Sequence, residues 1–198
     1  MEFKMELTAR QQEIIKVSIS LIADKGIQSL TIKNISQAIG ISEPAIYRHF
    51  QNKFEILMTI LNSFELIATD VLHSEDIKSL NSLDKIEFFL LDRYQRCAKN
   101  PKLAKVMFAE ENFQDDERLA NKVLNIMHSH KAAMHKVISA GQNLGEIRDD
   151  IDSISLFRII FGPMRLLIKQ WGLSGCKFNL VQEGKRLWEA EKKMLTKR

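Results

Sequence analysis

The stretch from Ile41 to Leu57, ISEPAIYRHFQNKFEIL, constrains the fold of this chain more than any other part. It follows a short amphipathic segment that ends at Gly40. Together they predict a helix, a tight turn, a short second helix and a further helix with its own cap. The short helix places Tyr, Arg and His side chains outward and Ile and Phe side chains inward. Outward polar side chains of this kind have little use in a core, but they suit the major groove of DNA.

The composition indicates a globular chain of one large domain or two small ones. Its 198 residues are 45% hydrophobic, which supports a buried core, and glycine and proline are scarce, as in mostly helical proteins. Cys97 and Cys176 lie far apart and fit no metal or redox spacing. The charged N-terminus lacks the apolar region of a signal peptide, and Arg158, Arg165 and Lys169 interrupt the longest apolar stretch. We therefore expect a cytoplasmic protein without a membrane span.

Helix start and stop signals follow one another closely in the N-terminal part. Residues 8–25 have apolar positions near a 3.6-residue period and end at Gly26, a usual residue after a helix. Thr31 is a suitable N-cap for a second helix. Gly40 suits the turn that ends this helix, because a left-handed backbone is favourable for glycine alone. Ser42 is the expected cap of the third helix.

The third helix is short, and its side chains divide into two groups. Ile46 and Phe50, four residues apart, are expected to anchor it to the two preceding helices. Asn52 followed by Glu55 resembles a capping box and predicts a fourth helix over about residues 52–72. This order of elements is a helix–turn–helix. In such motifs the second helix enters the major groove, and its first residues meet base edges.

The segment GISEPAIYRHFQNKFEIL, preceded by TIKNISQAIG, resembles the TetR (tetracycline repressor-like) family of bacterial regulators. The cap, the turn glycine, the Tyr-x-His-Phe sequence and the following lysine fall at the family's spacings. The resemblance covers about residues 8–58, and the rest of the chain agrees in helical character and length only. It implies a dimeric DNA-binding regulator.

The resemblance also implies roles for residues of the helix–turn–helix. Phosphate-contacting positions of the family match Thr31, Ser42, Tyr47, His49 and Lys53. Positions that face bases or their edges match Lys33, Glu43, Pro44, Ala45 and Arg48. Glu43 is a less usual occupant, because phosphates repel it, although it can accept from a cytosine amino group. Residues 1–60 hold seven Lys and Arg against six Asp and Glu, so DNA contact depends on a few directed side chains.

The whole chain predicts an all-α fold of about nine helices. We expect an N-terminal three-helix helix–turn–helix DNA-binding domain over residues 1–55. A C-terminal helical ligand-binding and dimerisation domain is expected over residues 56–198, with the fourth helix as the link between the two. Further helices are predicted at about residues 82–99, 101–111, 115–141, 152–171 and 178–195.

The predicted helix at residues 152–171 is apolar around most of its girth, which is typical of a helix buried on two sides. One side can face its own domain and the other a partner chain, although a central helix in a monomer is the alternative. Together with the last helix, it predicts a four-helix interface in a homodimer. The predicted interface residues are Leu156, Ile160, Leu167, Trp171, Leu180, Gly184, Leu187 and Trp188.

Bulky methionine and aromatic side chains from the central helices predict an apolar ligand pocket. Such residues pack adaptably and often line ligand sites, although the same residues also suit an ordinary core. The predicted lining is Phe89, Tyr94, Met107, Phe108, Met127, His130, Met134, Phe157, Phe161 and Met164. His130 is either a core histidine with satisfied hydrogen bonds or the polar group of the pocket. The spacing of His128, His130 and His135 suits no common metal site, and no cofactor is expected.

These observations predict a sequence-specific DNA-binding transcriptional regulator. We expect a homodimeric repressor that a small, apolar ligand of unknown identity releases from a palindromic, double-stranded operator. The alternative is a DNA-bound adaptor whose C-terminal domain recruits a protein partner without a small-molecule effector. An enzyme is not expected, because the sequence has no nucleophile and base at a suitable spacing, no phosphate loop and no zinc signature.

Overall fold

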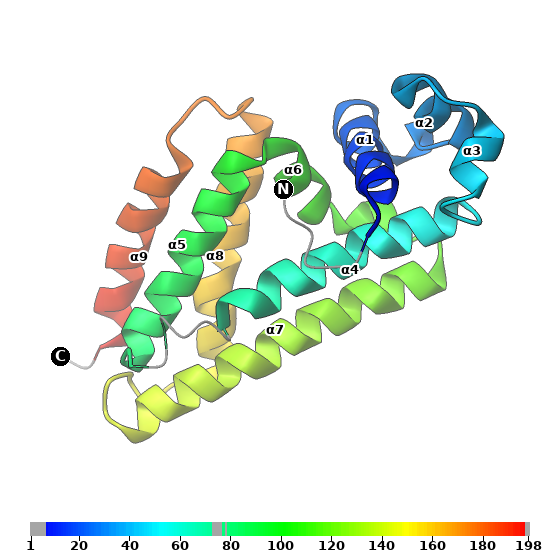
Figure 1. Cartoon of the computed structure of the whole chain (residues 1–198). Coiled ribbons are helices and arrows are strands. Elements are labelled where there is room, and N and C mark those ends of the chain that lie inside the picture. The colour runs from blue at the N-terminus through cyan, green and yellow to red at the C-terminus, as the bar shows by residue number, and fades with distance from the viewer. Residues whose placement is uncertain (1–6, 73–76, 78, 197–198) are drawn as a thin grey trace. The chain divides into compact units, whose positions relative to one another are not determined.

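The computed structural model describes residues 7–72, 77 and 79–196, the side chains of residues 67–72 excepted. Within these residues it contains nine α-helices and no strand, so the all-α prediction is confirmed (Figure 1). The α-helices are α1 (Ala9–Lys25), α2 (Ile32–Ile39), α3 (Glu43–Tyr47), α4 (Lys53–Leu72), α5 (Ser82–Lys99), α6 (Pro101–Met107), α7 (Glu117–Asn143), α8 (Ser153–Leu173) and α9 (Leu180–Leu195), with short 3-10 helices η1 (Ile27–Ser29) and η3 (Glu110–Phe113). Over the described part of the chain, none of the helices combines the length and apolar character that crossing a bilayer requires.

The chain folds into two compact units. Unit 1 comprises residues 1–67 and 105–126, and unit 2 comprises residues 68–104 and 127–198. The first unit therefore contains a segment from the middle of the chain, which the predicted boundary after residue 55 did not include. The division into a DNA-binding domain and a ligand-binding and dimerisation domain stays a prediction about function.

Side-chain caps fix where the helices of unit 1 begin. The Thr8 hydroxyl accepts from the Gln11 N–H at 3.3 Å, and the Gln11 side chain accepts from the Thr8 N–H at 3.0 Å. Asn52 accepts from the Glu55 N–H at 3.0 Å before α4, while Glu55 reaches back to the Gln51 N–H at 2.6 Å. Each pair satisfies N–H groups that have no partner within the helix itself.

Contacts from residues 105–126 attach this segment to the N-terminal helices within unit 1. The Lys105 ammonium donates to the carbonyl of Ala23 near the end of α1. The Arg118 guanidinium lies over the Phe54 ring, 3.8 Å from its centroid. The Phe113 side chain from η3 is buried in the same unit. These three contacts therefore join segments that lie far apart in the sequence. They are a buried aromatic ring, a cation over a ring and a cation at the end of a helix.

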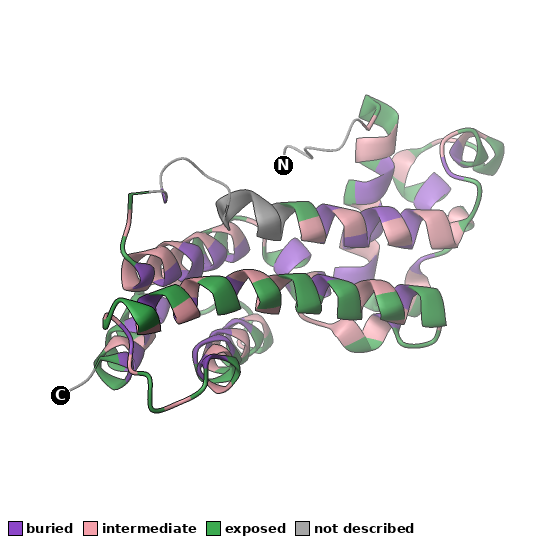
Figure 2. Cartoon of the chain, turned by 90° about the horizontal axis from the view of Figure 1, so that it is seen from below, coloured by how far each residue is buried: buried purple, intermediate pink, exposed green. Residues whose placement is uncertain are grey.

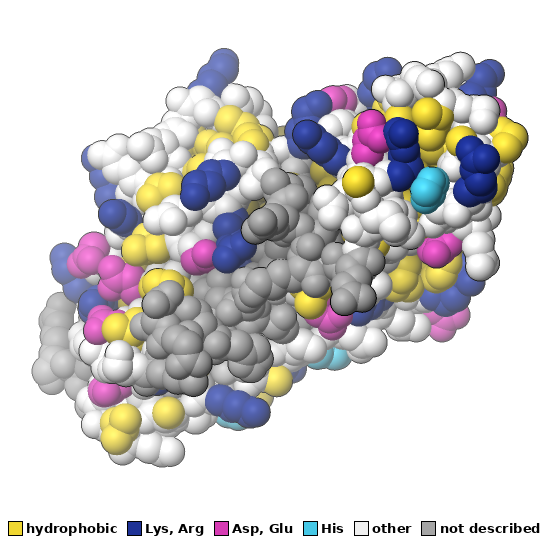
Figure 3. Space-filling model, viewed as in Figure 1, with side chains coloured by type: hydrophobic (Ala, Val, Ile, Leu, Met, Phe, Trp, Pro, Cys, Tyr) yellow, Lys and Arg dark blue, Asp and Glu magenta, His cyan; other side chains and the backbone are white. Residues whose placement is uncertain are grey.

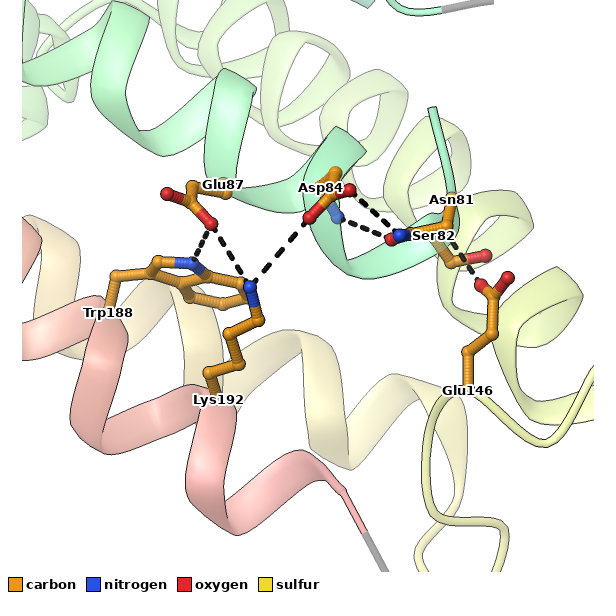
Figure 4. A network of polar contacts seen from close by, with 7 residues as sticks. All are labelled: Asn81, Ser82, Asp84, Glu87, Glu146, Trp188 and Lys192. Carbon is orange, nitrogen blue, oxygen red and sulfur yellow. Dashed lines mark hydrogen bonds and ion pairs between the residues drawn. The ribbon is translucent and has the colours of Figure 1, made fainter. Parts of the chain in front are cut away.

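Unit 2 is organised around α5, which packs along α9 and α8. Buried residues lie on one side of these helices and exposed residues on the other, as Figure 2 shows. At the start of α5, the Trp188 indole N–H donates to Glu87 at 2.8 Å (Figure 4). The Lys192 ammonium lies 3.3 Å from Glu87 and 3.7 Å from Asp84. This network holds one side of α9 to α5.

Glu191 on α9 is a carboxylic acid inside unit 2. It is 5% exposed, and its Oε1 atom has no hydrogen-bond partner among the described residues. Burial raises its pKa from 4.5 to about 7, because the charged form is poorly solvated there. The folded chain therefore keeps this proton to a higher pH than the unfolded chain does. Stability falls as the pH rises from about 4.5 to about 7 and then stays at its lower value.

Glu191→Gln is expected to remove this loss of stability, because the amide cannot ionise. At pH 8 the free energy of unfolding should rise by about 2 kcal/mol, a figure discounted for partial solvation. At pH 4 the variant and the wild type should be nearly equal. Urea denaturation at both pH values measures the difference, with the exposed Glu189→Gln on the same helix as control. An equal gain at both pH values would contradict the assignment.

Candidate nucleic-acid interface

The turn between α2 and α3 has the geometry that the sequence predicts. Gly40 adopts φ 80° and ψ 34°, a left-handed conformation. The N–H groups of Gly40 and Ile41 both donate to the Ser36 carbonyl, at 2.9 Å and 3.0 Å. These bonds close the end of α2 and direct the chain into α3. The predicted helix–turn–helix is therefore present.

Two buried residues hold α3 and the turn after it, which leaves the other side to solvent; Ile46 lies within α3, whereas Phe50 lies beyond its end at Tyr47, because the helix is shorter than predicted. Ile46 and Phe50 are almost completely buried, at 0% and 2% exposure. The Gln11 side chain also donates to the His49 carbonyl at 3.3 Å, which ties α1 to the chain just after α3. Tyr47, next to Ile46, is 51% exposed, so its hydroxyl group is available for contact with DNA.

The structure brings the predicted DNA contacts together at the start of α2, along α3 and at the start of α4. Among them, Thr31, Lys33, Ser42, Glu43, Pro44, Tyr47 and Arg48 are exposed, and Ala45, His49 and Lys53 are half-buried. Lys, Arg and His side chains gather over the head, α1 to α3, on the face seen in Figure 3, with few acidic side chains among them.

Two of these residues have local roles that bear on phosphate contact. Thr31 accepts from the Asn34 N–H at 3.1 Å as the cap of α2, so its own hydroxyl proton stays available for an anion. Ser42 occupies the N-cap position of α3, but its side chain makes no capping hydrogen bond. Both hydroxyl groups can therefore donate to a DNA backbone.

Lys53 has a different environment from the other predicted contacts. Its ammonium donates to the Ile27 carbonyl at 3.4 Å, and its side chain lines a cavity of about 210 Å³ inside unit 1. The cavity is lined by Ile27, Gln28, Lys53, Phe54, Leu57, Asn112, Phe113, Asp115, Asp116 and Leu119. An ammonium group has three protons, so phosphate contact by Lys53 stays a prediction. None of the predicted pocket residues lines this cavity.

The predicted pocket residues are divided between the two units. Met107 and Phe108 belong to unit 1 and the others to unit 2. Within unit 2, the rings of Phe89, Phe157 and Phe161 form a cluster, with centroids 5.5 Å apart for Phe89 and Phe161 and 4.6 Å for Phe157 and Phe161.

The other predicted pocket residues of unit 2 lie in varied surroundings. Met134 and Met164 are buried, His130 is half-buried and Met127 is 42% exposed. Tyr94 is buried against Gly184 of α9. The predicted pocket residues of unit 2 therefore include a ring cluster, ordinary core positions and one surface position.

Most residues of the predicted dimer interface are buried inside one protomer. These are Leu156, Ile160, Trp171, Leu180, Gly184 and Trp188, while Leu167 and Leu187 are half-buried. A Cβ atom on Gly184 would lie 2.3 Å from two atoms of the Tyr94 ring. Gly184 thus permits α9 to approach α5 of the same chain closely. The buried side chains leave a partner chain little to contact.

The exposed side of α8 carries apolar residues that are not among the predicted interface residues. Ile159, Leu166 and Leu173 are 38%, 58% and 81% exposed, and a Cβ atom on Gly162 would meet no atom within 4 Å. Spacings of three, four and seven residues place them along one side of the helix. We call these four residues the α8 stripe.

Two family models match this chain. The model for bacterial regulatory proteins of the tetR family matches residues 14–59, and that for the C-terminal region of YsiA-like proteins matches residues 52–191. The chain is 24% identical to the nucleoid occlusion factor SlmA of Actinobacillus pleuropneumoniae serotype 5b (strain L20) over 121 residues, 61% of this chain and 60% of that protein. It therefore spans about three fifths of the length of this relative.

Another relative is matched over most of its length. The chain is 24% identical to the fatty acid metabolism regulator protein of Bacillus subtilis (strain 168) over 174 residues, 87% of this chain and 88% of that protein.

Solved structures share the fold over nearly the whole chain. The fatty acid degradation regulator FadR from Bacillus halodurans superposes with a TM-score of 0.84 at 18% identity, covering 95% of this chain and 97% of that one. FadR from Bacillus subtilis in complex with stearoyl-CoA gives 0.77 at 23% identity, with 91% and 96% covered. The helix–turn–helix and both family models agree, and the chain belongs to the tetR family of bacterial regulatory proteins, which are DNA-binding transcriptional regulators.

Proposed function

We propose that this protein is a homodimeric repressor that a small ligand with a long apolar part releases from a palindromic operator. The observation that carries the proposal is the division of side chains on α3 and the turn that follows it. Ile46 and Phe50 anchor the helix in the head, while Tyr47 and Arg48 beside them are exposed. A short helix fixed in this way presents the same side chains to every DNA site, as sequence-specific reading requires.

The α8 stripe supports a dimer. Its apolar residues are exposed in the single protomer, and a helix side of this kind can pair with the same side of a second copy about a two-fold axis. Gly162, which has open space at its Cβ position, would let the two helices approach closely. Two heads related by this axis would occupy major grooves roughly 34–36 Å apart and read a palindrome.

Two relatives suggest what kind of molecule releases the DNA. One relative is a fatty acid metabolism regulator protein, and one solved relative is a complex with stearoyl-CoA. Unit 2 of this chain contains the ring cluster of Phe89, Phe157 and Phe161, which suits an aliphatic chain. A long-chain acyl ligand needs a preference of only a few kcal/mol for the DNA-free state to release the operator.

Gel-shift and footprinting experiments on DNA flanking the protein's own gene test this function. We expect specific binding at near-physiological salt and its loss when an acyl-CoA is added. No sequence-specific binding at that salt concentration would contradict the proposal. Specific binding that no apolar ligand weakens would instead favour the DNA-bound adaptor.

Substitutions in the head should separate backbone contact from base contact. Tyr47→Phe removes one hydroxyl and is expected to weaken all DNA sites alike, by about 3- to 10-fold. Arg48→Ala is expected to cost about 1–3 kcal/mol on the preferred operator and to relax selectivity there. Binding of both variants to the operator and to single-base variants of it measures the split. Equal losses on every site for Arg48→Ala would contradict its role at bases.

A further inference from the structure

Arg93 on α5 is a buried cation in unit 2. Its side chain is 3% exposed, and its Nη2 atom has no hydrogen-bond partner among the described residues. The guanidinium carbon lies 5.1 Å from the centroid of the Phe89 ring. A contact of this kind stabilises a cation, but it supplies no negative charge to balance it.

The nearest acidic groups do not neutralise Arg93. The Asp92 carboxylate already accepts from Arg96 Nε at 2.6 Å. Burial raises the pKa of the Cys97 thiol to about 12, although the charge of Arg93 acts to lower it, so this thiol is neutral at pH 7. Desolvation lowers the pKa of Arg93 itself, yet a guanidinium keeps its proton in proteins. The Glu191 carboxylate becomes neutral when it binds a proton, whereas the Arg93 guanidinium stays positively charged.

A buried charge without a partner destabilises a protein strongly, and a hydrophobic residue of similar size in its place is often neutral or stabilising. An unpaired charge that lowers the stability of the folded protein is therefore expected to have an anionic ligand as its partner. The surroundings indicate its chemistry. Arg93 lies over the Phe89 ring, Phe89 packs against Phe161 of α8, and Phe161 stacks on Phe157. A cation therefore borders an apolar cluster.

We propose that Arg93 binds the anionic group of the effector, with its aliphatic chain against Phe89, Phe157 and Phe161. The effector is then an amphipathic anion rather than a neutral apolar molecule. This inference rests on the proposed ligand-released repressor and specifies its ligand class. The anionic group can be the carboxylate of a fatty acid or a phosphate of an acyl-CoA, both of which accept charge-assisted hydrogen bonds from a guanidinium.

Three ligands with the same chain test the inference: dodecanoate, dodecanoyl-CoA and the neutral dodecanol. Their binding to the full-length protein is measured by calorimetry, and release of operator DNA by gel shift. Wild-type protein should bind at least one anion more tightly than dodecanol. Arg93→Met should weaken binding of that anion by about 10- to 100-fold and leave dodecanol binding unchanged.

Matched variants separate the charge of Arg93 from its packing. Arg93→Lys should retain a preference for the anion. Lys99→Met removes an exposed positive charge at the end of the same helix, leaves the Asp92–Arg96 ion pair intact and should change neither affinity. Arg93→Met should also raise the melting temperature of the ligand-free protein, because it removes the unpaired charge.

The outcomes distinguish this inference from the function on which it rests. A preference for dodecanoate assigns the anion to a fatty acid, and a preference for dodecanoyl-CoA alone assigns it to the phosphates. If dodecanol binds as tightly as both anions and releases the DNA equally well, the role of Arg93 is overturned while the ligand-released repressor stands. If none of the three binds or releases DNA, the proposed effector is overturned and this inference with it. A lower melting temperature for Arg93→Met would also overturn the inference.

Discussion

Replacement of Leu166 by glutamate is expected to convert the protein into a monomer and to weaken operator binding by at least about 100-fold. Leu166 lies in the middle of the α8 stripe and is 58% exposed in the protomer. At a two-fold interface the substitution brings two carboxylates close together in an apolar surface, where both lose solvation. A single head then has to bind a half-site alone, and residues 1–60 carry a net charge of only +1 to attract phosphates.

Analytical ultracentrifugation measures the oligomeric state, and fluorescence anisotropy measures the affinity for the operator. Leu144→Glu is the matched control, because Leu144 is 72% exposed in unit 2 but lies outside the α8 stripe. It makes the same change in charge and should leave both the dimer and DNA binding intact. A dimeric Leu166→Glu variant would place the interface elsewhere. A monomeric variant that binds DNA as wild type does would show that one head suffices.

The head could be predicted from sequence because its structure depends on signals close together in the chain. Gly40 marks the turn through its backbone conformation alone, and Thr31 caps α2 through a residue three positions away. Ile46 and Phe50 are anchors at helical spacing, and both are buried. Tyr47 and Arg48 are exposed because they follow Ile46 directly and turn away from the side that Ile46 and Phe50 bury.

The faces of α8 and α9 could not be assigned in the same way. Helix α8 is apolar around most of its girth, and its polar residues form only a narrow stripe, so its sequence does not distinguish a side that faces the core from a side that faces a partner. Ile160 and Trp171 pack inside the protomer, whereas Leu166 and Leu173 are exposed. Periodicity predicts that a residue is apolar and helical, but it does not identify what covers it.

Contacts between segments far apart in the chain could not be predicted from the sequence either. Nothing near Phe54 in the sequence indicates that Arg118 lies over its ring, or that Lys105 reaches the end of α1. These contacts place residues 105–126 in unit 1. Arg93 was missed for a related reason, because an arginine between Asp92 and Tyr94 on an amphipathic helix is typical of a solvent-exposed position. Only the three-dimensional packing reveals that it is buried.

Gly184→Ala is expected to lower the free energy of unfolding by about 3 kcal/mol, at the upper end of what overpacking of a core costs. The added Cβ atom would lie 2.3 Å from the Tyr94 ring, which is 1% exposed and has no room to withdraw. Either α9 moves away from α5 or the ring leaves its position. Trp188, one turn further along α9, would then lose its hydrogen bond to Glu87. Thermal denaturation should show a melting temperature lower by roughly 6–12 °C.

Gly172→Ala is the matched control, because a Cβ atom there meets nothing within 4 Å and the residue lies in the last turns of α8, off the α8 stripe. Alanine is the better helix former, so this variant should be unchanged or more stable by up to about 1 kcal/mol. The double variant Gly184→Ala with Tyr94→Leu gives the stricter test. If the clash is with the ring, the two losses combine to less than their sum, because the smaller side chain makes room for the methyl group. Additive losses would mean that the cost of alanine at position 184 arises from a contact other than Tyr94.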